Sequence, residues 1–175
     1  MKKVAFITMD VETFFDTSCV AERNVSYDKN FDAKQGFVDF IALLDRYGVK
    51  ATLFLTDSVL EPWADEISRC VKNGHKLAVH ALIHESPIGY DKTRFCSDVV
   101  AMQTKIEQKF GVKAIGYRAP CFGTTDDMLN WLKEIGFVYD SGALNFKGAA
   151  RSATANLQGF TELSDSVFRD GDFYE

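Results

Sequence analysis

The chain has 175 residues and a formal net charge of -5, with 46% hydrophobic and 26% charged residues. This length fits one domain with a sizeable core, and the balance excludes a disordered chain. The acidic charge and the absence of a lysine- and arginine-rich cluster exclude a nucleic-acid-binding footprint. No apolar segment is long enough to span a membrane. The N-terminus begins with two lysines before a short apolar run, as a signal peptide does, but it lacks a signal-peptide cleavage site, so we expect a cytoplasmic protein.

Apolar runs alternate with segments of helical spacing along the first 140 residues. Five strands that alternate with four helices indicate an α/β domain with a parallel sheet or barrel. The pattern predicts strands at 3–9, 50–55, 76–80, 112–117 and 137–139, and helices at 33–47, 57–73, 91–110 and 124–136.

Two regions are less regular. Residues 11–31 are polar with scattered aromatics and are predicted to form a long loop over a functional site. Residues 156–163 and 167–174 suggest extended structure, as edge strands. The four cysteines are widely spaced and form no CxxC pair, which favours buried free thiols over disulfides or a cysteine zinc site.

Polar residues follow several predicted strands, where ligands collect in parallel sheets and barrels. Asp10 and Glu12 stand two apart, so on an extended chain they share one face. Such a pair can divide labour, with one carboxylate binding a cation and the other taking a proton. Solvated acids at a loop entry are the alternative.

His80 and His84 are two of the three histidines in the chain. If the segment makes a helical turn, the two imidazoles lie on one face and can share one ion. The spacing is common by chance, but a carboxylate at another strand end favours a site for Zn²⁺, Fe²⁺ or Co²⁺. His75 sits at the opposite end of its strand and is predicted to be structural.

Three further segments are ambiguous on local grounds. Arg118 precedes a stiff Ala-Pro turn and could hold a carboxylate in a bidentate pair, or form a structural ion pair. Asp140 begins an Asp-Ser-Gly stretch that reads as a plain turn. Cys121 could be a nucleophile, but a packed or pocket-lining thiol is the better prediction.

Four stretches in order, ITMDVET, GHKLAVHALIH, GYRAP with CFGTTDDML, and GFVYDSGALN, resemble the polysaccharide deacetylase family (the NodB homology domain, carbohydrate esterase family 4). They cover most of residues 3–145. The Asp-Val-Glu and Arg-Ala-Pro forms resemble the branch of exopolysaccharide loci and peptidoglycan-type deacetylases. The resemblance implies a distorted, incomplete (β/α) barrel of mostly parallel strands and one divalent metal ion, zinc before cobalt, iron or nickel. It also implies these roles: Asp10 as general base, Glu12, His80 and His84 as metal ligands, Arg118 holding Asp10, the Cys121 backbone N–H at the oxyanion with Phe122 beside the substrate, and Asp140 supporting the site.

The chain departs from the family pattern in three places. Glu12 stands two positions after the base instead of directly after it, Cys121 replaces an aromatic residue, and no histidine follows His84 to act as general acid. We therefore expect a single domain over residues 1–175 that lacks its C-terminal strand and helix. The alternative is that another residue or water protonates the leaving group.

The predicted function is the removal of acetyl groups from N-acetylated sugar units of a polysaccharide or its precursor, so the expected partner is a carbohydrate. One alternative is a hydrolase of small cyclic amides or ureides on the same fold. The other is a carbohydrate-binding domain without catalysis.

Overall fold

The structure is a computed structural model that describes residues 6–16, 33–145, 154–157, 160–166, 169–170 and 173–174. Seven strands form one sheet in the order β1-β2-β3-β4-β5-β7-β6. Every neighbouring pair from β1 to β7 is parallel, and only β6 runs antiparallel, to β7. The strands are β1 (Ile7–Val11), β2 (Ala51–Thr56), β3 (Lys76–Ala81), β4 (Gly116–Tyr117), β5 (Tyr139–Asn145), β6 (Thr154–Leu157) and β7 (Phe160–Ser166), with a separate antiparallel pair, β8 (Arg169–Asp170) and β9 (Phe173–Tyr174).

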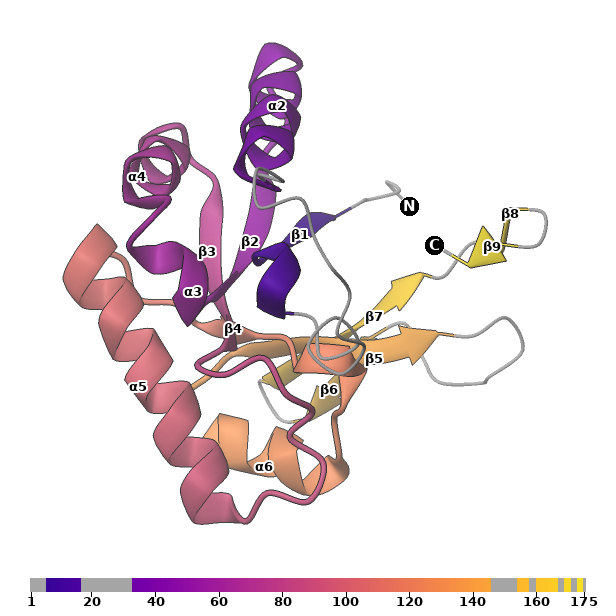
Figure 1. The fold of residues 1–175 in the computed structure, drawn as a ribbon. Coiled ribbons are helices and arrows are strands. Elements are labelled where there is room, and N and C mark those ends of the chain that lie inside the picture. Colours follow the sequence, from indigo (N-terminus) through magenta and orange to yellow (C-terminus); the bar gives the residue numbers. More distant parts are fainter. Residues whose placement is uncertain are drawn as a thin grey trace.

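The helices connect successive parallel strands and lie along the outer side of the curved sheet (Figure 1). This arrangement confirms the predicted distorted, incomplete (β/α) barrel of mostly parallel strands. None of the helices in the described ranges is long and apolar enough to cross a membrane. The helices are α2 (Ala33–Arg46), α3 (Asp57–Leu60), α4 (Ala64–Lys72), α5 (Lys92–Phe110) and α6 (Asp126–Glu134), with two short 3-10 turns, η1 (Phe14–Asp16) and η2 (Pro120–Phe122).

The core lies between the sheet and these helices. Leu53, Leu55 and Val79 on the central strands are fully buried. Phe37 of α2 stacks on Trp63 with ring centroids 5.5 Å apart, which joins α2 to the start of α4. Strands buried in this way are mostly apolar, so the hydrophobic runs of the sequence were the correct signal for them.

Several predicted boundaries were wrong. The helix expected at 57–73 is divided into α3 and α4, and Pro62, which has no N–H to donate, lies between them. The strand expected at 112–117 pairs only over Gly116–Tyr117, and the one expected at 137–139 runs instead over Tyr139–Asn145.

The C-terminal and N-terminal predictions are only partly tested. The extended region expected at 156–163 overlaps two antiparallel strands, β6 and β7, that are separated by residues 158–159. Most of the predicted loop at 11–31 lies outside the described residues, which include 6–16 and begin again at 33. The first residues of the predicted strand at 3–9 are outside it as well.

His75 lies at the opposite end of β3 from His80, where it has a structural role. Its Nδ1 accepts a hydrogen bond from the backbone N–H of Ala51 at 3.1 Å, so the ring proton is on Nε2 when the imidazole is neutral. That nitrogen then donates to Asp45 Oδ1, also at 3.1 Å. His75 thereby ties the end of α2 to the starts of β2 and β3, away from any strand end that carries a candidate site residue.

Gly116 provides a test of how closely β4 and β5 pack. A Cβ at this position would lie 2.0 Å from Cζ of Tyr139, whereas a Cβ at Gly36, on the exposed side of α2, meets nothing within 4 Å. We expect Gly116→Ala to lower the free energy of unfolding by about 1–3 kcal/mol through overpacking. Gly36→Ala should raise it by about 0.5–1 kcal/mol, because alanine favours the helix. Urea denaturation measures both, and equal stability of the two variants would refute the close packing.

Candidate functional site

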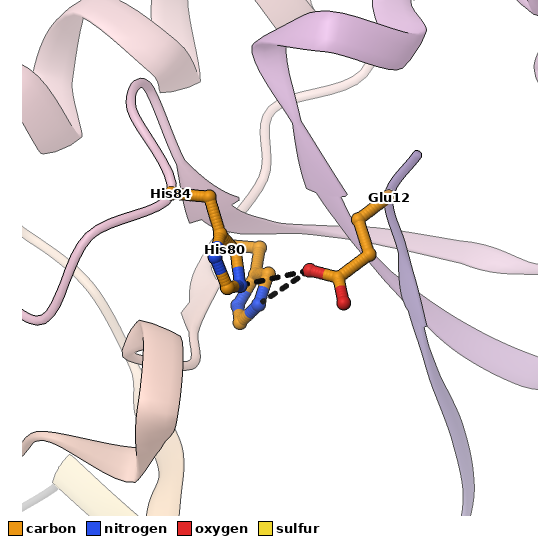
Figure 2. A group of neighbouring side chains, drawn as sticks. All are labelled: Glu12, His80 and His84. Atoms are coloured by element: carbon orange, nitrogen blue, oxygen red, sulfur yellow. Dashed lines mark ion pairs between the residues drawn. The ribbon is translucent and has the colours of Figure 1, made fainter. Parts of the chain in front are cut away.

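Three side chains from separate parts of the sequence meet at the C-terminal ends of β1 and β3. Glu12 follows β1, His80 lies in β3, and His84 lies in the loop after β3. Glu12 Oε2 is 2.8 Å from Nε2 of His84 and 3.6 Å from Nε2 of His80. Figure 2 shows both imidazoles directed toward this one carboxylate oxygen. One potential ligand atom from each residue lies within 4.8 Å of the others, the spacing of a three-ligand metal group.

The two histidines do not converge through a helical turn, which corrects the sequence-based expectation. β3 ends at Ala81, and the chain then bends through residues 82–85. The bend turns the second imidazole back beside the first, and the two ring centroids are 5.1 Å apart. Both imidazoles are buried, with side-chain exposures of 3% and 8%, while Glu12 is 25% exposed and leaves the group accessible from one side.

The tautomer of His80 is fixed by the backbone. Its Nδ1 is 2.8 Å from the carbonyl oxygen of Arg118, which can only accept a hydrogen bond, so Nδ1 carries a proton. In the neutral ring Nε2 is therefore the nitrogen with a free lone pair, and it is the one that faces Glu12. A hydrogen bond of this kind orients metal-binding histidines and raises their basicity.

The Glu12 carboxylate is held in its charged form. Burial opposes its ionisation, but the neighbouring imidazoles of His80 and His84 outweigh that effect and lower the pKa of Glu12 to about 2. The hydrogen bond with Glu12 in turn raises the pKa of His84, against the opposing effect of burial.

A second pair lies on the neighbouring part of the same sheet edge. Arg118 Nη1 donates to Asp10 Oδ1 at 2.7 Å, and the guanidinium is itself buried. Nη2 donates to Thr8 Oγ1 at 2.9 Å and to Ser141 Oγ at 2.8 Å, and Nε donates to the Ser141 carbonyl at 3.0 Å. The guanidinium carbon lies 4.2 Å from the centroid of the Phe54 ring. These contacts fix the orientation of the guanidinium toward Asp10.

Arg118 connects the pair to the histidines. Its side chain holds Asp10, while its carbonyl oxygen holds His80. One residue thus sets the position of a carboxylate that can accept a proton and of an imidazole that can bind a metal. The Arg-Ala-Pro turn has both functions because its backbone continues β4 alongside β3, where Arg118 N donates a hydrogen bond to the Val79 carbonyl.

The turn after Arg118 has an unusual backbone. Cys121 and Phe122 have φ angles of 54° and 53°, in the left-handed region that non-glycine residues rarely adopt. Such strain persists where surrounding structure determines the conformation, and it is common at functional sites. The described cysteines, Cys70, Cys96 and Cys121, are free, but the expectation of buried thiols holds for Cys70 alone, because Cys96 is half-buried and Cys121 is exposed.

Asp140 does not lie at a turn, as its Asp-Ser-Gly stretch suggested, but inside β5. It is fully buried, and its Oδ2 accepts a hydrogen bond from the Gly142 backbone N–H at 2.8 Å. The register of β5 against β7 shifts between Asp140 and Ala143, so this carboxylate stabilises an irregular strand. Complete burial prevents direct contact with a substrate.

Sequence reasoning missed two contributors, Thr8 and Ser141, which both accept hydrogen bonds from Arg118. Thr8 could have been predicted, because it stands two residues before Asp10 on an extended strand and therefore lies on the same face of the strand as Asp10. Ser141 was not, because the irregular register of β5 decides which of its neighbouring polar residues faces the guanidinium.

The chain is similar to known proteins in sequence and in fold. Residues 15–139 match the family model described as polysaccharide deacetylase. The peptidoglycan deacetylase-like protein FGM2 of Gibberella zeae is 27% identical over 113 residues, which are 63% of this chain and 33% of that protein. The chain therefore spans about a third of the length of this curated relative.

Two solved structures have the same fold. A protein from Mycobacterium smegmatis, named as a candidate polysaccharide deacetylase, superposes with a TM-score of 0.71 at 22% identity, covering 93% of this chain and 58% of that one. A family 4 acetyl xylan esterase from Clostridium thermocellum, solved with a cobalt ion, gives a TM-score of 0.57 at 19% identity, covering 79% of this chain and 57% of the other. Asp10 and Glu12 lie before the residues that the family model matches, so the positions of these two acids rest on the geometry alone.

Proposed function

Because the chain belongs to the polysaccharide deacetylase family, we propose that it is a metal-dependent hydrolase that removes acetyl groups from N-acetylated sugar units. The observation that carries this proposal is the meeting of Glu12, His80 and His84 beside the Asp10–Arg118 pair. One group can hold a cation, and the other can accept a proton. A metal-dependent hydrolase of amides or esters uses both at the same place.

The proposed metal ligands are Glu12 Oε2 and Nε2 of each histidine. Two imidazoles and one carboxylate suit Zn²⁺, Co²⁺, Fe²⁺ or Ni²⁺, and the exposed side of Glu12 leaves room for water and substrate. The cobalt ion in the Clostridium thermocellum esterase supports a transition metal. A divalent cation held there would supply Lewis acidity, which polarises a carbonyl group and lowers the pKa of water.

Asp10 is the proposed general base. Its carboxylate is paired with the Arg118 guanidinium, which holds it in one orientation. It would accept the proton of the attacking water. Arg118 keeps the carboxylate aligned during this transfer, with Thr8 and Ser141 fixing the guanidinium.

The remaining residues have proposed supporting roles. The backbone N–H of Cys121, on the strained turn after Arg118, would donate to the developing oxyanion. Phe122, about one-third exposed, would contact the substrate beside it. Asp140 would support the site by fixing the course of β5 next to Ser141. The general acid that protonates the leaving amine is, in this proposal, water or a residue outside the described set.

The proposed substrate class can be tested by measuring acetate release. Purified protein, loaded with Zn²⁺ or Co²⁺, would be incubated with N-acetylglucosamine oligomers, acetylated xylan fragments and small cyclic amides such as hydantoin. We expect metal-dependent acetate release from the N-acetylated oligomers. Ring opening of the cyclic amide without acetate release would instead favour the small-molecule hydrolase, and metal binding without turnover of any substrate would favour a carbohydrate-binding domain.

The proposed metal site should depend on pH through His84. The hydrogen bond to Glu12 raises the pKa of His84, so this imidazole keeps its proton to a higher pH than a free histidine. A cation must displace that proton. We therefore expect metal affinity to be highest above the raised pKa and to fall by roughly tenfold per pH unit below it. Isothermal titration with Zn²⁺ in several buffers between mildly acidic and mildly alkaline pH measures this slope, and an affinity that is constant over the range would contradict it.

A further inference from the structure

The loop that carries His84 joins β3 to α5 and contains no helix or strand between residues 82 and 91. Two backbone hydrogen bonds shape it: Glu85 N donates to the Ile83 carbonyl at 2.8 Å, and Tyr90 N donates to the Pro87 carbonyl at 3.0 Å. These bonds define local turns, but they do not attach the loop to the rest of the molecule. The position of the His84 imidazole therefore depends on what holds this loop.

Three side chains close the loop onto α5. Glu85, the residue after His84, accepts hydrogen bonds on the same oxygen, Oε1, from Tyr90 Oη and from Arg94 Nη2. Arg94 Nη2 also donates to Tyr90 Oη at 2.9 Å. The guanidinium carbon of Arg94 lies 3.7 Å from the centroid of the Tyr90 ring, a stacked cation–π contact. We call Glu85, Tyr90 and Arg94 the loop clamp.

The clamp is anchored on a rigid element. Arg94 lies in the first turn of the 19-residue helix α5, which begins at a capping hydrogen bond from Arg94 N to Asp91 Oδ1 at 2.8 Å. The next residue, Phe95, is buried and packs edge-to-face on Tyr117 with centroids 5.6 Å apart. The backbone of Arg94 is thus fixed by both a cap and the core.

The charges in the clamp match its geometry. Burial and the hydrogen bond to Glu85 raise the pKa of Tyr90 to about 12, so the phenol keeps the proton that it donates. The hydrogen bond from Tyr90 lowers the pKa of Glu85, which stays ionised opposite the guanidinium. Isolated exposed ion pairs contribute little, but here a planar guanidinium is stacked and hydrogen-bonded at once.

We propose that Glu85, Tyr90 and Arg94 are positioning residues that set the affinity of the site for its divalent cation by holding the loop of His84 against α5. The proposal rests on the proposed metal-dependent function. None of the three touches the group formed by Glu12 and the two histidines through a hydrogen bond or ion pair among those described, so they act through the loop. Outer residues that orient a ligand typically change metal affinity by about 10- to 100-fold.

The test uses substitutions that preserve charge, because loss of the Glu85 carboxylate alone would weaken cation binding by simple electrostatics. Tyr90→Phe removes the hydroxyl but keeps the ring, and Arg94→Lys keeps the positive charge but loses the planar stack. The double variant should bind Zn²⁺ or Co²⁺ about tenfold more weakly than wild type in isothermal titration. Hydrogen exchange of the metal-free protein should be faster for the amides of residues 82–90 only. Lys105→Arg, which alters an ion pair with Asp57 elsewhere on α5, is the matched control and should change neither measurement.

The possible results separate the two proposals. Weaker metal binding together with faster exchange in the loop supports the positioning role. Wild-type affinity in the double variant overturns it and leaves the metal-dependent function standing. A wild-type protein that binds neither ion overturns the proposed function, and the positioning role with it.

Discussion

His84→Ala is expected to abolish tight binding of a divalent metal, and His80→Ala to do the same. Each substitution removes one of only two imidazoles that face Glu12. A carboxylate and a single imidazole seldom hold a transition ion firmly, so we expect affinity to fall by at least about 100-fold, beyond what the loss of an outer residue costs. Elemental analysis of purified protein after reconstitution, together with titration of Zn²⁺ or Co²⁺, measures the loss.

The matched control is His75→Asn. This histidine is also buried, but it bonds to Ala51 and Asp45 at the other end of β3. The substitution should lower thermal stability and leave about one metal ion per chain. If His84→Ala kept stoichiometric metal while remaining folded by circular dichroism, the assignment of the ligand group would be wrong. Loss of metal in the His75 variant as well would show only a general loss of structure.

The site could be predicted from sequence to the extent that local patterns place residues at strand ends. The apolar run before Asp10 and the one before His80 identify two strands of one sheet, and parallel strands bring their C-terminal ends to the same edge. From that step alone, the meeting of Glu12 with the histidines could be expected. The break in the helix predicted at 57–73 could also have been predicted, because Pro62 lies within that range.

Other features depend on contacts that no local pattern contains. β4 pairs with β3 only through Tyr117, because the chain from 112 to 115 does not join the sheet, so its length could not be read from its apolar residues. The approach of His84 to His80 follows from a bend, where a helical turn had been assumed. The loop clamp illustrates the same limit. Glu85 and Arg94 are nine residues apart, a separation that matches neither helical nor strand periodicity.

Asp10→Asn is expected to separate catalysis from metal binding. Asparagine has the same shape, and its amide oxygen can still accept the hydrogen bond from Arg118 Nη1, so the fold and the metal group should persist. A neutral amide cannot take a proton from water. We therefore expect kcat to fall by roughly 10²- to 10⁴-fold, the usual contribution of a general base, while metal content stays at about one ion per chain. Asp57→Asn, which changes a surface pair with Lys105, is the control and should retain wild-type turnover.

The companion variant Glu12→Gln tests how the two acids divide their roles. Glu12 is the carboxylate that both imidazoles approach, and Asp10 is the one that the guanidinium holds, so loss of metal is expected from Glu12→Gln alone. The opposite pattern, with metal lost in Asp10→Asn and kept in Glu12→Gln, would mean that the two acids exchange roles when a cation binds. Arg118 would then hold a metal ligand instead of a base. The two spacings in the sequence, Asp10 to Glu12 and His80 to His84, are the same in either case, so only the pair of measurements decides between them.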